Sequence, residues 1–182
     1  MPHPDVRLAR RVYDSGMDTW LAIASRREVR EYADREIPEE VVRTILDAGR
    51  LTGSARNRQP WRFLVVESAE ARERLADAVY APGNVRGAKL IVAIAGRSGF
   101  DTGRCAQNMA LAAWNEGVGS CPNGIKEAEQ AQQALGLDAD DEIAIVLTFG
   151  YPANDRDPLR RTPEEWSSQA DRKSLDEIVE RI

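Results

Sequence analysis

Histidine, cysteine and long apolar runs are scarce in this chain of 182 residues. The one histidine is His3, so the sequence offers no Ser-His-Asp or Cys-His catalytic set and no histidine-based metal site. Its two cysteines, Cys105 and Cys121, form neither a CxxC pair nor a disulfide framework, which is typical of reduced thiols in a cytoplasmic protein. If the chain is an enzyme, we expect a cofactor to supply the difficult chemistry.

A basic surplus and a membrane-length segment are lacking as well. The net charge is -5, which argues against a general nucleic-acid binder, because neutralising phosphates needs a basic surface. No apolar run approaches the roughly 20 residues that span a bilayer, and the N-terminal sequence lacks the apolar core of a secretory signal. We therefore predict a cytoplasmic protein without nucleic-acid or membrane partners. Local arginine clusters in an acidic chain suit a small anionic ligand.

Length and composition predict a single domain over residues 1–182, in which residues 152–182 form a C-terminal arm and helix. The hydrophobic pattern predicts alternating helices and strands. A wholly apolar run at 90–95 is typical of a strand that is buried on both faces. The alanine-rich stretch 102–116 indicates a core helix, a helix at a subunit interface, or both. Helices are expected near 6–25, 38–52, 69–79, 102–116, 126–135 and from 174, and strands near 63–66, 90–95 and 143–149.

The first polar segment that could carry chemistry is a cluster of arginines at a predicted helix end. Arg26, Arg27 and Arg30 fall within five residues, and guanidinium groups bind phosphate in a bidentate manner while staying charged. Glu28 and Glu31 lie among them. A solvated, salt-bridged face is therefore the alternative to a phosphate site.

A second segment has the order Gly-Ser-x-x-Asn-x-Gln-Pro-Trp from Gly53 to Trp61. Its amides, Asn57 and Gln59, can donate to and accept from the edge of a heterocycle, while the tryptophan would anchor the strand that follows. An ordinary polar turn is the alternative. The third segment, Arg160-Arg161, reads on its own as a charged loop.

A glycine-containing segment at 117–124 does not match the dinucleotide-binding fingerprint. It follows a predicted helix rather than a strand, and its glycines have the wrong spacing. On its own it indicates no function, and it becomes informative only through its position among the other segments.

Taken in order, these segments resemble the FMN-dependent nitroreductase family. The resemblance is carried by Arg26–Tyr32, Ile37–Glu40, Gly53–Phe63, Gln107–Ala113, Gly117–Gly124, Phe149–Ala153 and Arg160-Arg161, and it covers roughly residues 20 to 165. It implies an α+β fold, with a mixed β-sheet flanked by helices, in an intertwined homodimer that binds FMN at the interface.

The resemblance also implies which residues bind the flavin. The arginines would hold the phosphate and ribityl end, Ser54 and Asn57 would approach the ring from the partner subunit, and Asn123 and Gly124 would offer backbone donors to it. Asn84, in an expected Pro-Gly-Asn turn, would also reach the ring. The full set of matching positions is Arg26, Arg27, Glu28, Arg30, Ser54, Asn57, Gln59, Asn84, Asn123, Gly124, Arg160 and Arg161.

The chemistry implied is a ping-pong reaction. A hydride would pass from NAD(P)H through flavin N5 to an electron-poor acceptor such as a nitroaromatic or a quinone, and no side chain would act as an essential acid or base. Two alternatives stay open. One is a flavin-binding relative with another activity, reductive dehalogenation or flavin destruction. The other is a non-enzymatic module that binds a phosphorylated ligand.

The sequence departs from the family pattern at two places. Glu28 stands where the family commonly has serine, and a carboxylate beside a phosphate costs about 1–4 kcal/mol unless Arg27 or Arg30 neutralises it or ribityl hydroxyls donate to it. The second departure is brevity, because only residues 96–102 separate the second predicted strand from the long helix, where larger members insert a helical excursion over the substrate. An open, shallow site with broad selectivity is therefore expected.

Overall fold

The computed structural model describes residues 17–97 and 99–182, and this described chain divides into two units. The larger unit is Arg27–Arg156, and the smaller one combines the two ends of the chain, up to Arg26 and from Asp157. The predicted helical stretch 6–16 lies outside the described residues, and the predicted single domain stays a prediction. Within residues 17–97 and 99–182, every helix is too short or too polar to cross a membrane.

The larger unit is built on a four-stranded sheet in the order β1-β2-β4-β3. Each neighbouring pair of strands runs antiparallel. The central strand β2 is buried along its whole length, as its apolar run predicts. A parallel component comes from an isolated bridge between Glu28 and Ser120. The strands are β1 (Arg62–Val65), β2 (Leu90–Ala95), β3 (Gly119–Asn123) and β4 (Ile143–Gly150).

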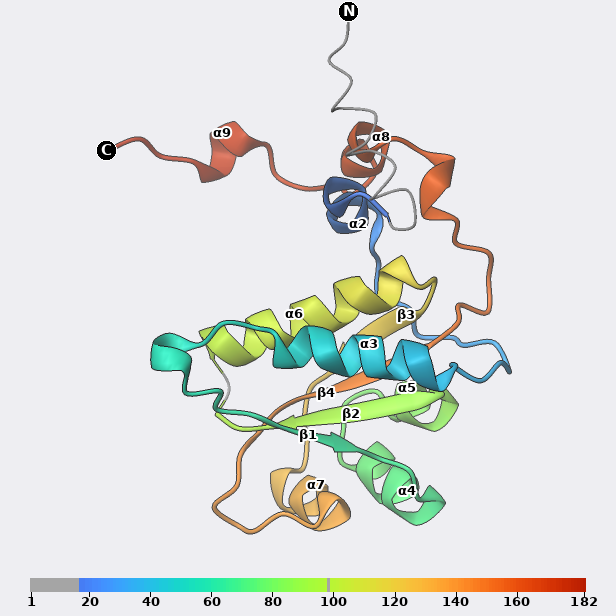
Figure 1. Ribbon diagram of the computed structural model, residues 1–182, viewed down its shortest axis with the longest axis vertical. Helices are drawn as coiled ribbons and strands as arrows, with labels where there is room; N and C mark the ends of the chain where they lie inside the picture. Colours follow the sequence, from blue (N-terminus) through green and yellow to red (C-terminus); the bar gives the residue numbers. More distant parts are fainter. Residues whose placement is uncertain (1–16, 98) are drawn as a thin grey trace, which may run out of the picture. The chain divides into compact units, whose positions relative to one another are not determined.

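Helices cover both faces of this sheet, with α3 and α6 on one side and α4 and α7 on the other (Figure 1). Successive β2 side chains therefore enter two different hydrophobic clusters. Val92 packs with Met109 of α6, whereas Ile91 packs with Leu75 of α4. The helices are α3 (Glu39–Arg50), α4 (Ala69–Asp77), α5 (Pro82–Gly87), α6 (Phe100–Asn115) and α7 (Ala128–Leu135), and a 3-10 turn, η1 (Ala55–Asn57), follows α3.

Close packing of α3 on α6 fixes where the segment after α3 starts. Gly49 lies against Met109, and a Cβ at that glycine would collide with the methionine side chain. Phe63 of β1 and Trp61 join the same cluster, so the chain on both sides of η1 is anchored. The predicted anchoring role of Trp61 is thereby confirmed.

The smaller unit consists of short capped helices. Asp18 caps α2 by accepting from the Trp20 and Leu21 amides, and Thr162 caps α8 in a reciprocal arrangement with Glu165. α2 packs against α8 and contacts η2. These elements are α2 (Thr19–Ser25), η2 (Pro158–Arg160), α8 (Pro163–Ser168) and α9 (Leu175–Ile178).

Two local predictions were wrong. Residues 119–123 lie outside the three predicted strands but form strand β3, because pairing with β4 overrides the weak strand propensity of glycine, proline and asparagine. Pro122 is tolerated there because β3 is an edge strand. Pro82-Gly83-Asn84 opens helix α5 instead of a turn, with proline in its first turn.

Candidate functional site

The loop between α3 and β1 has an unusual backbone. Arg56, Asn57 and Gln59 have φ angles of 55°, 53° and 48°, in the left-handed region that costs a non-glycine residue about 1–2 kcal/mol. Asparagine tolerates this region better than arginine does, because its side chain can bond locally. Residues 55–60 are exposed (the teal turn between α3 and β1 in Figure 1). A strained, exposed loop of this kind is typical of a ligand-binding segment.

A few hydrogen bonds hold this loop. The backbone amide of Gln59 donates to Ser54 Oγ at 2.8 Å, and the backbone amide of Asn57 donates to the Ser54 carbonyl at 2.9 Å. The Ala55 amide donates to Asp101 Oδ2 at 3.0 Å. The structure therefore brings together three predicted residues, Ser54, Asn57 and Gln59, and gives the Ser54 hydroxyl a part in shaping the loop.

Asn84 and Asn123, both predicted to lie near the ring, meet in the core of the larger unit. Asn84 Nδ2 donates to Asn123 Oδ1 at 2.8 Å, and both side chains are almost fully buried. Asn123 Nδ2 donates in turn to the Cys121 carbonyl at 3.0 Å and to Thr148 Oγ1 at 3.1 Å. Both side chains are therefore hydrogen-bonded within the protein, and they stabilise the end of β3 from the core side.

Thr148 is the hub of this buried polar network. Its hydroxyl donates to the Cys121 carbonyl at 3.1 Å and lies 2.9 Å from the Tyr32 hydroxyl. Burial raises the pKa of Tyr32 above its usual value of about 10, and the hydrogen bond with Thr148 opposes only part of that shift. Tyr32 is therefore a neutral partner in the network at ordinary pH.

Gly124 follows this network and is exposed. Its carbonyl accepts from the Tyr80 amide at 3.2 Å, and the Tyr80 ring, 73% exposed, lies next to the glycine. The end of β3 therefore presents backbone to solvent beside an exposed aromatic ring.

Arg30 of the arginine cluster borders a small cavity. Arg30 and Arg156 line this cavity of about 220 Å³ together with Glu28, Glu31 and Asn154. The two guanidinium groups can bind an anionic group, and the two carboxylates can accept hydrogen bonds from hydroxyl donors. The cavity therefore suits a ligand that carries both kinds of group. The carboxylate expected to stand in the phosphate region is thus found beside arginine. Nearby in the sheet, Ser120 Oγ is buried and has no hydrogen-bond partner among the described residues.

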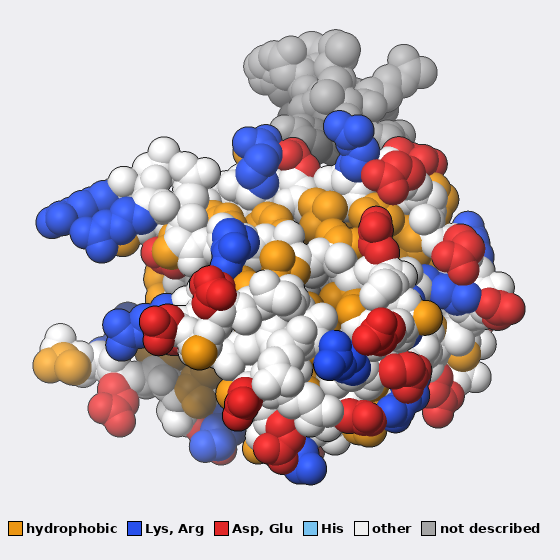
Figure 2. Space-filling model, turned by 90° about the horizontal axis from the view of Figure 1, so that it is seen from below, with side chains coloured by type: hydrophobic (Ala, Val, Ile, Leu, Met, Phe, Trp, Pro, Cys, Tyr) orange, Lys and Arg blue, Asp and Glu red, His pale blue; other side chains and the backbone are white. Residues whose placement is uncertain are grey.

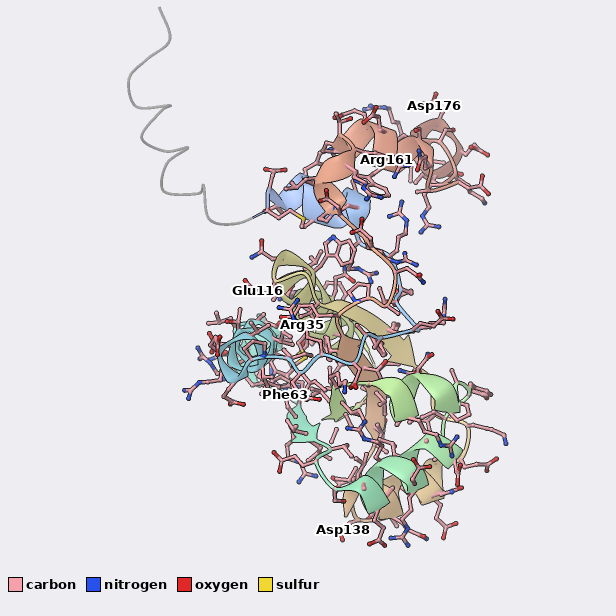
Figure 3. All side chains as sticks on the ribbon, turned by 90° about the vertical axis from the view of Figure 1, so that its right-hand side faces the viewer. Arg35, Phe63, Glu116, Asp138, Arg161 and Asp176 are labelled. Carbon is pink, nitrogen blue, oxygen red and sulfur yellow. The ribbon has the colours of Figure 1, made fainter. Side chains whose placement is uncertain are left out.

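The remaining predicted arginines divide between the two units. Arg27 begins the larger unit, whereas Arg26, Arg160 and Arg161 belong to the smaller one. Arg26 ends α2, and Arg160 ends η2, which contacts α2. Arg161 lies beside α8 (Figure 3), with its guanidinium 4.7 Å from the centre of the Trp166 ring.

Sequence reasoning missed several residues of this region, namely Asp101, Ser120, Thr148 and Tyr80. Asp101 lies in the first turn of α6, which begins after Gly99. Thr148 lies inside an apolar strand pattern, which gives no sign that its hydroxyl is a hub. A polar residue inside an otherwise apolar strand is the signal that could have found it, because a buried hydroxyl needs partners.

Two other surfaces show no concentration of the predicted site residues or of one sign of charge. A hollow of about 700 Å³ lies along α3 and is lined by residues such as Leu46, Leu51 and Phe63, with none of the predicted site residues. On the face shown in Figure 2, acidic and basic side chains are interspersed rather than separated by sign. Within residues 17–97 and 99–182, no group of His, Cys, Asp and Glu side chains is placed to hold a metal ion.

Comparisons with known proteins agree with the fold. The nitroreductase family model matches residues 23–98 and 95–151. A protein from Methanothermobacter thermautotrophicus, named "Putative NADH dehydrogenase/NAD(P)H nitroreductase", is 33% identical over 84% of this chain and 90% of its own length.

Solved structures show the same similarity. A nitroreductase family protein from Clostridium difficile matches 90% of this chain and 98% of its own, with a TM-score of 0.75 and 24% identity. A "putative nitroreductase in complex with fmn" from Desulfovibrio desulfuricans matches 91% of this chain and 98% of its own, with a TM-score of 0.73 and 29% identity. The α+β architecture and the family resemblance are both confirmed, and the chain belongs to the nitroreductase family.

Proposed function

We propose that this chain is an FMN-dependent oxidoreductase that uses NAD(P)H as its electron donor. The observation that carries the proposal is the match over 91% of the chain with a relative described in complex with FMN. The name of the archaeal relative, which includes NAD(P)H, supports the choice of donor. The scarcity of histidine and the two isolated cysteines agree with chemistry that a cofactor supplies.

We propose that the cavity lined by Arg30 and Arg156 holds the polar end of FMN. Arg27 and Arg30 would bind the phosphate, with Arg156 as a further donor from the cavity wall. Glu28 would accept hydrogen bonds from ribityl hydroxyls, and neighbouring guanidinium groups would offset its charge. The buried Ser120 hydroxyl would gain a partner from a polar ligand beside β3.

The ring would lie against backbone rather than against charged side chains. Asn123 and Gly124 would offer amide donors at the end of β3, where fixed dipoles stabilise charge that develops on a flavin. Asn57, Gln59 and Ser54 belong to the exposed loop, which we propose approaches the flavin of a partner subunit. Asn84 acts behind Asn123 through their hydrogen bond.

The smaller unit and the assembly complete the proposal. Arg26, Arg160 and Arg161 would close on the phosphate, as their match to the family pattern implies. An intertwined homodimer with FMN at the interface, in the cytoplasm, would let both subunits contribute to each site. A small electron acceptor is the remaining partner.

The chemistry that bound FMN supplies is hydride acceptance from NAD(P)H at N5 and delivery to an electron-poor acceptor, in alternating half-reactions. The protein would bind and orient the donor and acceptor in turn on one face. Only Gly96–Gly99 connect β2 to α6, so we propose an open site that accepts several nitroaromatics or quinones.

Reduction of the reconstituted protein under anaerobic conditions tests this proposal. The FMN-loaded protein should lose its yellow colour on addition of NADH or NADPH and regain it on addition of a nitroaromatic or a quinone. Steady-state rates at several fixed acceptor concentrations should give parallel double-reciprocal lines. A protein that holds FMN without being reduced by either nicotinamide would contradict the oxidoreductase assignment, and one that takes up no FMN would contradict the whole proposal.

A further inference from the structure

One stripe of α6 runs along the chain segment that leads into the strained loop. Asp101, Arg104, Cys105 and Asn108 recur at helical spacing, and each contacts residues between positions 49 and 55. Asn108 Nδ2 donates to Thr52 Oγ1 at 2.8 Å, and the Cys105 thiol lies 3.5 Å from the Gly49 carbonyl. The stripe therefore guides the chain from the end of α3 to the start of the loop.

Asp101 makes the last contact of this stripe, and it is the one that reaches the loop itself. Its Oδ2 accepts from the Ala55 amide at 3.0 Å, while its Oδ1 lies 3.8 Å from the Arg104 guanidinium. That guanidinium also lies over Gly53. The Asp101 side chain is only 22% exposed, so its carboxylate is held between the helix and the loop.

The left-handed residues follow directly after this bond. Arg56, Asn57 and Gln59 keep their positive φ angles only if the ends of the loop are held. Behind the loop, the partly buried Trp61 packs against the core. In front of it, Thr52 is buried, and the Ala55 amide beyond Thr52 is hydrogen-bonded to Asp101 of α6.

We propose that Asp101 is a positioning residue of the flavin site. By accepting from the Ala55 amide, it holds residues 54–59 in the conformation that presents Asn57 and Gln59 to the flavin. This inference rests on the proposed FMN function. The short connection Gly96–Gly99 makes it possible, because α6 then begins close enough to the loop for its first turn to reach Ala55.

Limited proteolysis provides a readout that does not depend on the flavin. Arg56 and Arg58 are exposed and give trypsin two sites inside the loop. In the full-length apoprotein, Asp101→Ala should speed cleavage after these two residues by about fivefold or more, because local opening governs access of the protease. Asp101→Asn, which keeps an oxygen acceptor, should fall between wild type and Asp101→Ala.

A matched control separates loop positioning from fraying of the helix. Thr102 Oγ1 accepts from the Gly99 amide at 3.0 Å, so Thr102→Ala weakens the same helix end without touching Ala55. Cleavage of Thr102→Ala at Arg56 and Arg58 should stay within about twofold of wild type. Equal acceleration in Thr102→Ala and Asp101→Ala would overturn the proposal.

Equilibrium titration with FMN then tests the link to the flavin. Asp101→Ala should raise the Kd for FMN by about tenfold, and Thr102→Ala should leave it near the wild-type value. A loosened loop with unchanged FMN affinity would overturn the positioning role while leaving the proposed function intact. Wild-type protein that binds no FMN would instead overturn the function on which the inference rests.

Discussion

The exposed loop at 54–59 and the buried network behind β3 are two contrasting parts of the proposed site. The loop is strained, solvent-exposed and tied to α6 by the bond from Ala55 to Asp101. In the network, Asn84, Asn123 and Thr148 are buried and linked by short hydrogen bonds. One part is shaped by a tether from another element, and the other by burial of polar groups that must all find partners.

The difference shows how one site can combine rigidity with adaptability. Removing a partner from a buried network leaves other groups unsatisfied, so such a network has essentially one arrangement. An exposed loop pays no such penalty, so its conformation depends on a small number of local bonds. We expect substitutions in the network to change global stability by more than substitutions in the loop do, and substitutions in the loop to act mainly on ligand binding.

The largest effect is expected from Thr148→Val, which keeps the shape of the hub and removes its hydroxyl. Asn123, Tyr32 and the Cys121 carbonyl each lose a partner, so the free energy of unfolding should fall by about 2–4 kcal/mol. Thr148→Ser keeps the hydroxyl and should cost about 1 kcal/mol for the lost methyl group. Urea denaturation measures both. Equal losses would mean that packing rather than hydrogen bonding makes Thr148 important.

Alkaline pH should weaken the network through Tyr32. Because burial raises the pKa of Tyr32 in the folded protein, the unfolded chain loses this proton first, and stability falls as pH rises above about 10 by at most about 1.4 kcal/mol per pH unit. Cys105 adds to the decline from a lower pH, because burial raises the pKa of its thiol to about 11.

Tyr32→Phe should remove the tyrosine contribution and flatten the curve of unfolding free energy between pH 10 and 12. Tyr80→Phe, at an exposed ring, is the matched control. The explanation fails if both variants keep the wild-type slope.

A smaller effect of opposite sign is expected in the loop. Arg56→Gly relieves a left-handed backbone conformation and should raise the free energy of unfolding by about 1 kcal/mol, offset in part by the greater freedom of glycine in the unfolded chain. Arg43→Gly, at an exposed position within α3, should lower it by about 1 kcal/mol. Thermal unfolding distinguishes the two signs. A destabilised Arg56→Gly would mean that the loop is not strained.

Much of the fold could be predicted from local patterns. The apolar run of β2, the helix expected near 38–52 and the helix expected from 174 each depend on neighbouring residues in the sequence, and each was found where expected. β3 could not be predicted this way, because Gly119, Pro122 and Asn123 favour no strand on their own. The strand exists because β4 supplies its partners.

In the candidate site, too, the residues could be identified from the sequence but their long-range contacts could not. The sequence identified Asn57, Gln59, Asn84 and Asn123 as candidate site residues. In the structure, Gln59 is hydrogen-bonded to Asn57, and Asn84 to Asn123. The sequence could not show that Asn84 and Asn123 bond to each other, because 39 residues separate them. Nor could it show that Asp101 reaches back over 46 residues to the loop. Such long-range contacts are properties of the folded chain.

Equilibrium titration of the apoprotein with FMN tests the central claim most directly. The wild-type chain should take up FMN in stoichiometric amounts. Arg30→Ala should weaken binding by about 10- to 100-fold, because a charge-assisted contact in the cavity is lost. Arg43→Ala, at an exposed arginine of α3 away from that cavity, should bind like wild type. No uptake by the wild-type chain, or equal affinity for Arg30→Ala and wild type, would contradict the assignment of this cavity to the flavin phosphate.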